Sequence, residues 1–347
     1  MSNWQGQTYK ADCLSPKETW DIFDSTKVKA FQECPRRFFY NYVLGWSKEE
    51  GNIHLDFGGA FHEGMEVIVK ALKSGRPHDD ILAEACIAFD RFFDRVYPNE
   101  ALHSDFSPKD PKHAYMAYET YLEHYIDEDI TCLHTELPGV VAVSPDHHIH
   151  FKMDGVGEAG DGHPSYHGVV ALEHKTGSRN SLVWREGWHL ALQPTVYTHA
   201  LNCLYGIENV DYVVINGVFL YKDKIGLERV PVKKNLEQMR EWIWEIQHTF
   251  HVIDHNMEAL TQADTGEPFL RCFPKNTGAC TDWGRICPYA DFCMAGKNPL
   301  HFADEPPYGF HEKHWNPQKE HENAKETLVV EEGKAEIVVS GVQADNG

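Results

Sequence analysis

Residues 151–157 (FKMDGVG) and 169–177 (VVALEHKTG) predict two neighbouring β-strands joined by a glycine-rich reversal. Side chains alternate along a strand, so Glu173 and Lys175 should share one face of the second strand. Asp154 is expected at the end of the first strand, and pairing of the strands would bring it opposite Glu173. Two carboxylates and a lysine at one sheet edge can hold a hard divalent cation and stabilise charge on a phosphate.

The apolar run before Glu173 predicts a strand that is covered on both faces, as in a sheet with helices packed on it. Further strands are expected at residues 131–144, with an interruption near Pro138, and at residues 210–222 and 227–232. Helical periodicity predicts helices at residues 57–73, 78–97, 110–127, 187–205 and 235–255. We therefore expect an α/β fold with a central mixed β-sheet flanked by helices and with a helical insertion.

A length of 347 residues is enough to bury a sizeable core. We expect an irregular lead-in over residues 1–24, followed by a helix that is capped by Ser25. One folded domain should span residues 25–300. Residues 301–347 are expected to form a flexible acidic tail, in which the segments LVV and AEIVV could form a short hairpin or dock on a partner.

Four further polar residues have both a structural and a functional interpretation. His62 lies beside the apolar stripe of the helix at residues 57–73, where a histidine is commonly structural but can also be a ligand. Gln193 and Tyr197 are four residues apart and share a helix face, so they can line a site, pin the helix to the sheet, or do both. Glu136 can orient a metal site or be an ordinary charge at a strand edge.

The nine cysteines are an odd number, and Cys272, Cys280, Cys287 and Cys293 lie close together near the C-terminus. This spacing is not typical of a secreted disulfide scaffold and more often indicates a bound metal. Cys34 precedes Pro35, which should break a helix and leave the thiolate accessible. Four thiolates suit an iron–sulfur cluster or structural zinc, whereas a lone free cysteine is usually a small buried side chain.

The formal net charge is −21, which is unfavourable for a protein that grips long duplex nucleic acid. Residues 301–347 hold ten acidic and four basic side chains, so most of the negative charge belongs to the folded part. The charge fits a narrow channel that engages a strand end, or a partner that supplies affinity. The N-terminus has no apolar signal region and no run could span a bilayer, so we expect a cytoplasmic protein without membrane contact.

Taken together, the order GxxxH (ending at His62), Asp154, Glu173-x-Lys175 and Gln193-xxx-Tyr197 resembles the PD-(D/E)xK nuclease superfamily. More narrowly, it resembles the RecB-type branch, which includes the CRISPR-associated iron–sulfur exonucleases. The resemblance covers most of the chain and implies a restriction-endonuclease-like core.

The resemblance also implies roles for individual residues. Mg²⁺ or Mn²⁺ would be bound by His62, Asp154, Glu173 and the backbone carbonyl of His174. Asp154, Glu173 and Lys175 would be catalytic. Gln193 and Tyr197 would contact DNA.

The segment CPRRFFY, which begins at Cys34, and the segment CPYADFC, which ends at Cys293, resemble the two ends of that branch's iron–sulfur motif. The resemblance implies a [4Fe–4S] cluster held by Cys34, Cys280, Cys287 and Cys293, with zinc as the second choice. Six residues separate Cys280 from Cys287, which is longer than the usual gap, so Cys272 or Cys280 could be the remaining ligand. Arg36 and Arg37 could contact DNA phosphates or form a solvated helix face.

The function that the resemblance implies is a metal-dependent DNA exonuclease acting on DNA ends or single strands. It would serve DNA repair, recombination, or phage- or CRISPR-type DNA processing, with a recombination or helicase protein as a partner. Two alternatives remain. The negative charge suits a non-catalytic DNA-end or partner-binding subunit of a recombination complex. An iron–sulfur redox sensor is the other, but it leaves the D…ExK series unexplained.

Overall fold

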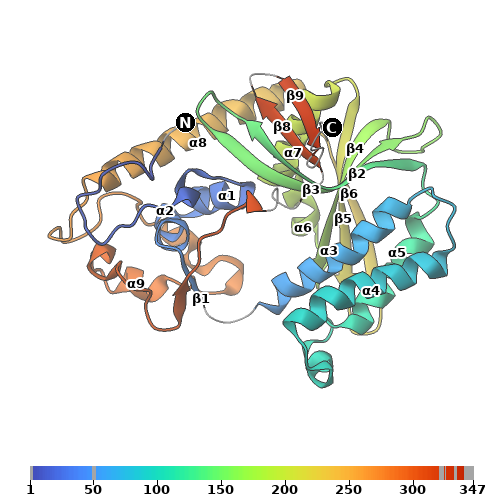
Figure 1. Cartoon of the computed structure of the whole chain (residues 1–347), viewed down its shortest axis with the longest axis horizontal. Helices are drawn as coiled ribbons and strands as arrows, with labels where there is room; N and C mark the ends of the chain where they lie inside the picture. The colour runs from blue at the N-terminus through green and yellow to red at the C-terminus, as the bar shows by residue number, and fades with distance from the viewer. Residues whose placement is uncertain (1–2, 49–51, 320–323, 325, 332–333, 340–347) are drawn as a thin grey trace, which may run out of the picture. The chain divides into compact units, whose positions relative to one another are not determined.

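The computed structural model describes residues 3–48, 52–319, 324, 326–331 and 334–339 (Figure 1). The chain divides into two compact units. The sheet unit comprises Gly51–Gly139, Lys152–Asn235 and Ala324–Gly347, and the cysteine unit comprises Met1–Glu50, Val140–Phe151 and Leu236–Asn323. The one domain expected over residues 25–300 is thus divided between two units, because segments that are distant in sequence pack together within each.

Seven of the described strands form one sheet in the order β6-β5-β4-β3-β2-β8-β9, which belongs to the sheet unit except for the end of β2 and the start of β3. Their bounds are β2 Ile130–Ala142, β3 His148–Ala159, β4 Gly168–Gly177, β5 Val210–Leu220, β6 Ile225–Val232, β8 Glu326–Glu331 and β9 Lys334–Val339. Strands β4 and β5 run parallel, whereas the β3–β4, β5–β6 and β8–β9 pairs are antiparallel. The predicted α/β fold with a mixed sheet is therefore confirmed.

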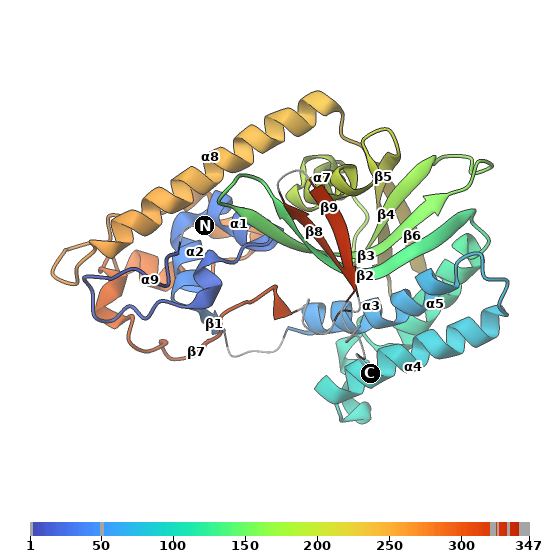
Figure 2. The ribbon, with the colours of Figure 1, turned by 45° about the horizontal axis from the view of Figure 1, so that its top comes forward.

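Helices cover both faces of this sheet (Figures 1 and 2). They are α3 Ile53–Ala71, α4 His78–Val96, α5 Pro111–Tyr125, α6 Leu182–Leu190 and α7 Leu192–Tyr205, with a 3₁₀ turn, η3, at Glu100–Phe106. Helices α3, α4 and α5 share a buried core with Leu172 of β4 and Val218 of β5. Trp184 of α6 packs instead against Phe219, the neighbour of Val218. Because alternate residues of a strand point to opposite faces, the two groups of helices cover opposite faces.

The predicted helix at residues 187–205 is two helices in the structure. Helix α6 ends at Leu190, Ala191 is extended, and α7 begins at Leu192. Pro194 explains the break, because its ring would clash with the carbonyl of Leu190 inside one continuous helix. In the first turn of a new helix, the missing N–H of a proline costs nothing.

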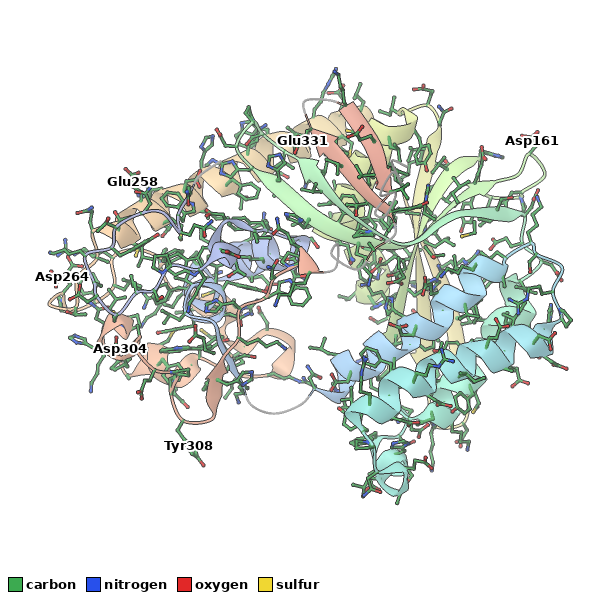
Figure 3. All side chains as sticks on the ribbon, viewed as in Figure 1. Asp161, Glu258, Asp264, Asp304, Tyr308 and Glu331 are labelled. Carbon is green, nitrogen blue, oxygen red and sulfur yellow. The ribbon has the colours of Figure 1, made fainter. Side chains whose placement is uncertain are left out.

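Strand β3 does not end at Asp154 as expected but continues to Ala159, because Gly155–Ala159 pair with Gly168–Leu172 of β4. The loop between these strands is correspondingly short, and Asp161 lies at its tip (Figure 3). Asp154 is therefore an interior position of a strand and not its last residue.

The tail expected over residues 301–347 contributes a β-hairpin to the sheet unit. Strands β8 and β9 pair along their length, and β8 lies next to β2 in the sheet. Leu328 and Val330 are buried and alternate with more exposed residues, which is the pattern of a strand with one covered face. For the segments LVV and AEIVV, the sequence left open a short hairpin or docking on a partner, and the structure contains the hairpin.

The cysteine unit is built from short elements around one long helix. They are η1 Glu18–Asp21, α1 Ser25–Glu33, α2 Pro35–Phe38, η2 Phe39–Val43, β1 Trp46–Lys48, α8 Leu236–Thr261, η4 Thr277–Gly284, α9 Ala290–Met294, η5 Pro299–Phe302 and β7 Phe310–Glu312. Asp24, not Ser25, caps α1, because its carboxylate accepts the N–H of Lys27. Cys34 lies at the break between α1 and α2, as Pro35 predicts, but it is buried and not accessible as expected.

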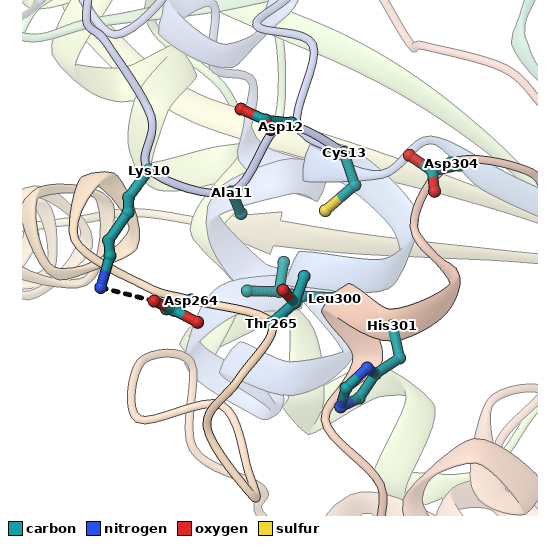
Figure 4. A pocket seen from close by; sticks show the side chains of 9 residues that line it. All are labelled: Lys10, Ala11, Asp12, Cys13, Asp264, Thr265, Leu300, His301 and Asp304. Carbon is teal, nitrogen blue, oxygen red and sulfur yellow. Dashed lines mark ion pairs between the residues drawn. The ribbon is translucent and has the colours of Figure 1, made fainter.

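The described residues of the lead-in are largely irregular, as expected, apart from η1, and they pack into the core of this unit. Trp20 and Phe23 are buried. Lys10 pairs with Asp264 at 2.5 Å beside a cavity of about 380 Å³ that also borders His301 and Asp304 (Figure 4). The first residues of the chain are thereby tied to its C-terminal third.

Lys27 of α1 is buried among carbonyl groups of the lead-in. Its ammonium group donates hydrogen bonds to the carbonyl oxygens of Thr19, of Trp20 at 3.5 Å and of Ile22 at 2.8 Å. It also lies 4.5 Å from the centre of the Phe23 ring. Burial lowers the pKa of Lys27 to about 7, although Asp24 and Asp21 oppose this change.

We expect the free energy of unfolding of the wild-type chain to rise with pH relative to that of Lys27→Met. The pKa of Lys27 is about 7 when folded and near 10.5 when unfolded, so between these values the unfolded chain binds more protons. Stability therefore rises with pH in that window, by at most about 1.4 kcal/mol per pH unit. Urea unfolding of both proteins at several pH values measures the difference, and a difference independent of pH would contradict the lowered pKa of Lys27.

Gly64 of α3 lies against the ring of Tyr118, whose hydroxyl donates a 3.0 Å hydrogen bond to the carbonyl of Phe61. A Cβ at Gly64 would overlap the Tyr118 side chain, which is fully buried and cannot retreat. Gly64→Ala should therefore destabilise the fold by about 1–3 kcal/mol.

Gly58 on the same helix offers a matched control, because a Cβ there meets nothing within 4 Å. Gly58→Ala should be neutral or stabilise the fold by up to about 1 kcal/mol, since alanine favours a helix. Urea unfolding of both variants measures the contrast, and equal effects would mean that the Gly64 contact is not tight.

Candidate active site

Asp154 and Glu173 lie at corresponding positions of neighbouring strands. In the β3–β4 pair Gly155 is opposite Leu172, which makes Asp154 and Glu173 the next opposing residues. Asp154 Oδ2 accepts a 2.7 Å hydrogen bond from the backbone N–H of His174, and both carboxylates are buried. The structure thus brings together the two carboxylates that the hairpin predicts.

His62 reaches this site from α3. Its Nδ1 lies 3.0 Å from Asp154 Oδ1. Burial lowers the pKa of His62, but the charges of Asp154 and Glu173 raise it to about 9. Burial likewise raises the pKa of Asp154, yet the nearby His62 holds it well below its usual range. The carboxylates of this site therefore attract positive charge strongly.

Glu136 of β2 completes a group of possible metal ligands with His62 and Asp154. One ligand atom from each residue lies within 4.8 Å of the other two, and no other group of three His, Cys, Asp or Glu in the described part of the chain does so. Burial and the charge of Asp154 raise the pKa of Glu136 to about 7. One imidazole nitrogen and two carboxylate oxygens are a donor set that fits Mg²⁺ or Mn²⁺, and the imidazole suits Mn²⁺ well.

Glu173 is turned toward a lysine and a pair of helix side chains. Lys175 Nζ lies 2.5 Å from Glu173 Oε1, so the two residues share one face of β4 as expected. Gln193 Nε2 donates to the same oxygen at 2.9 Å, and the Tyr197 hydroxyl lies 3.1 Å from Glu173 Oε2. The Tyr197 hydroxyl also contacts the carbonyl of Lys152. Gln193 and Tyr197 therefore fix α7 to the sheet and hold Glu173 in place.

His174 lies between Glu173 and Lys175, and its ring points to the opposite face of the sheet. The ring centre is 5.7 Å from that of Tyr121, and burial lowers the pKa of His174 to about 3. Its two ring nitrogens have no hydrogen-bond partner among the described residues. The side chain is thus part of the packing against α5, and its ring centre also lies 6.5 Å from that of His62, whereas its backbone N–H donates to Asp154.

Lys152 is a neighbour of the site that the sequence analysis did not single out, and for Glu136 the sequence left a metal-site role and an ordinary strand-edge charge both open. Lys152 Nζ lies 2.6 Å from the Glu136 carboxylate. Lys152 precedes Asp154 by two residues on one strand, so period-two alternation could have placed both on one face. No such signal exists for Glu136, whose φ of 47° lies in the left-handed region that a side chain in a strand rarely adopts.

The two arginines that were candidates for DNA contact lie in the cysteine unit, at the start of α2. Arg36 is buried, and its guanidinium donates to the carbonyl oxygens of Phe273 at 2.9 Å and Leu270 at 3.2 Å. Arg37 pairs with Glu33 on the preceding turn. Arg36 is therefore a structural clamp and is not exposed to DNA, because the carbonyl groups of this cysteine-rich loop need a buried donor.

Four of the five candidate cluster cysteines line one cavity of about 370 Å³ in the cysteine unit, and Cys272 does not. They are Cys34, Cys280, Cys287 and Cys293. Burial raises the pKa of the Cys287 thiol, and the neighbouring thiols of Cys280 and Cys34 raise it further. Cys272 is instead buried in the core beside Arg36.

The spacing of these sulfur atoms bears on the choice of metal. Around one zinc ion, with Zn–S bonds near 2.3 Å, tetrahedral sulfur atoms are about 3.8 Å apart. No three of the cysteine sulfurs in the described residues lie within 4.8 Å of one another. Four thiolates around one cavity are a donor set for either an iron–sulfur cluster or structural zinc, and a single zinc ion would require these sulfur atoms to move closer together.

The fold and the site together define a class, which is an α/β nuclease built around two carboxylates and a lysine. The comparison with known families agrees, because the PD-(D/E)XK nuclease superfamily matches residues 25–294. The chain belongs to this superfamily, which supports a hydrolytic nuclease. Nucleases of this superfamily generally use divalent metals, and the group of His62, Glu136 and Asp154 is a possible site for one.

Two solved structures show a distant likeness. A proposed exonuclease from Eubacterium rectale is 14% identical, with a TM-score of 0.43, over 72% of this chain and 87% of that chain. The protein SSO0001 is 10% identical, with a TM-score of 0.27, over 57% of this chain and 84% of that chain. No curated protein matches the sequence. Among the described helices, none is long and apolar enough to cross a membrane.

Proposed function

We propose that the protein is a metal-dependent DNA exonuclease of the RecB type, acting on DNA ends or single strands. The observation that carries the proposal is the group of His62, Glu136 and Asp154 beside the Glu173–Lys175 pair. Asp154, Glu173 and His62 would hold Mg²⁺ or Mn²⁺, together with Glu136 and the carbonyl of His174. When bound, the ion would lower the pKa of a water molecule and offset the charge of the scissile phosphate.

The side chains around the metal group have separate tasks in this proposal. Burial lowers the pKa of Lys175, but Glu173 and Asp154 raise it above its ordinary value, so the side chain stays an ammonium group. Lys175 would donate hydrogen bonds to the phosphate oxygen that gains charge in the transition state. Gln193 and Tyr197 hold the Glu173 carboxylate in place for metal binding. Both side chains would also contact the DNA strand.

The test is cleavage of end-labelled single-stranded DNA by the purified protein with Mn²⁺ or Mg²⁺. We expect progressive shortening of the strand that stops when the metal is chelated. Absence of product on blunt, recessed and single-stranded ends with both metals would contradict the proposal.

Glu136→Gln should weaken Mn²⁺ binding by at least about tenfold, because a metal ligand loses its charge. Mn²⁺ binding is measured directly by calorimetry, with a catalytic assay in parallel. Glu158→Gln is the matched control, since Glu158 is an exposed residue of the same sheet. Equal Mn²⁺ affinity in both variants would remove Glu136 from the ligand set.

The second candidate function is a non-catalytic DNA-end or partner-binding subunit of a recombination complex. The net charge of −21 favours it, because such a chain has little affinity for duplex DNA of its own. Binding of DNA ends without turnover under every metal would support this function. Under either function, a recombination or helicase protein that supplies DNA affinity is the partner we propose.

For the cysteine unit we propose a [4Fe–4S] cluster on Cys34, Cys280, Cys287 and Cys293, with zinc as the second choice. The shared cavity and the spacing of the sulfurs support it. The cluster would join the start of the unit, at Cys34, to its C-terminal part. Its role would be structural, because these ligands come from segments that are far apart in the sequence.

A further inference from the structure

Helix α6 exposes large apolar side chains close to the candidate active site. None of its residues is buried, and Leu182, Val183 and Leu190 are 63%, 71% and 89% exposed. Exposed apolar side chains of this size on one short helix usually mark a binding surface. The described contacts of the sheet unit leave these side chains uncovered.

The position of α6 is fixed by its N-terminal half. Ser181 caps the helix by accepting the N–H of Trp184 at 3.2 Å, and the Trp184 ring lies 4.8 Å from that of Phe219 on β5. A Cβ at Gly217 would overlap the Trp184 ring, so the glycine at this position allows Trp184 to pack against β5. The exposed face of α6 is therefore carried on a rigid support.

Trp188 connects this surface to the candidate active site. The Lys175 ammonium lies 5.9 Å from the centre of the Trp188 ring. The Trp188 ring is half-buried and contacts Trp184 edge-on at 5.8 Å. Its indole nitrogen has no hydrogen-bond partner among the described residues, so packing alone holds the ring.

Basic side chains flank α6, although the chain as a whole is strongly acidic. Arg179 precedes the helix and is exposed. Arg185 lies on the helix, 3.8 Å from Glu228, which is too far for a tight ion pair. Lys234 donates a 2.5 Å hydrogen bond to the carbonyl of His189 near the helix end. An aromatic ring and apolar side chains interleaved with basic groups are the pattern that binds single-stranded nucleic acid.

We propose that α6 is the surface on which single-stranded DNA enters the active site, an inference that rests on the proposed nuclease function. Trp188 stacks on a base beside the scissile phosphate, and Leu190 contacts the next bases. Arg179, Arg185 and Lys234 bind the phosphates. Base faces are free only in an unpaired strand, so this surface selects single strands and frayed ends over intact duplex.

The test measures DNA binding apart from cleavage. In the Asp154→Asn background, fluorescence anisotropy with a labelled oligothymidylate gives the dissociation constant. Trp188→Ala should raise it about tenfold, whereas Trp188→Phe should retain most of the affinity, because no hydrogen bond is lost. Leu190→Ser should raise it several-fold, and its exposure makes unfolding no concern.

Two further measurements separate stacking from a merely structural role. On an oligonucleotide without bases, Trp188→Ala and its parent should bind equally, because the stacking partner is absent. Arg179→Ala should reduce the slope of log affinity against log salt by about 0.7, which corresponds to one lost phosphate contact.

The controls are Ile87→Ser and Arg91→Ala on the exposed side of α4, which should leave affinity unchanged. Affinity of the α6 variants equal to that of these controls would overturn the inference, even if the protein cleaves DNA. If the wild-type protein does not cleave DNA but the α6 variants still lose DNA binding, the result would support α6 as the DNA-binding surface. It would reject only the nuclease function.

Discussion

Asp154→Asn should lower the rate of DNA cleavage by at least about 10³-fold. It removes the carboxylate that lies between the metal group with His62 and Glu136 and the Glu173–Lys175 pair. Asp154 contacts His62 on one side and the backbone N–H of His174 on the other. Asparagine has nearly the same shape and can still accept a hydrogen bond from that N–H. The variant should therefore fold, with a thermal midpoint close to that of the wild type.

Asp161→Asn is the control for this prediction, because it makes the same chemical change at an exposed loop tip (Figure 3). It should cleave at the wild-type rate. The measurement is the initial rate on end-labelled single-stranded DNA with saturating Mn²⁺. Wild-type cleavage by Asp154→Asn would place the chemistry elsewhere, and an unfolded variant would assign Asp154 a structural role.

The fold and the centre of the site are predictable from the sequence because both depend on local patterns. The alternation along β4 is a property of the strand itself, so it places Glu173 and Lys175 on one face without knowledge of any tertiary contact. The four-residue spacing of Gln193 and Tyr197 works in the same way on a helix.

Other features depend on contacts between distant segments, and no local pattern reports them. Glu136 joins the metal group only because its strand carries an unusual backbone angle and lies near α3. Arg36 resembles a surface charge in the sequence, since nothing near it shows that the carbonyls of Leu270 and Phe273 require its donors. The division into two units likewise follows from tertiary contacts between segments that are far apart in the chain.

Cys287→Ser should remove the proposed iron–sulfur cluster and much of the stability of the cysteine unit. The free energy of binding a structural metal group is added to that of folding, and for structural zinc it is about 10 kcal/mol or more. The proposed ligands are Cys34 at the end of α1, Cys280 in η4, Cys287 between η4 and α9, and Cys293 in α9, so loss of one thiolate would loosen all these segments. Protein purified without oxygen should be coloured and bleach with dithionite, whereas the variant should be colourless and should unfold at a lower temperature.

Cys272→Ala and Cys280→Ala decide which cysteine is the remaining ligand. Cys280 lines the shared cavity and Cys272 lies outside it, so Cys280→Ala should lose iron while Cys272→Ala keeps it. Cys272→Ala should cost only the packing of one small buried side chain, about 1–2 kcal/mol. The reverse result would move the cluster toward Arg36 and the core. Colourless wild-type protein containing one zinc per chain would instead show that the sulfurs close around a single ion.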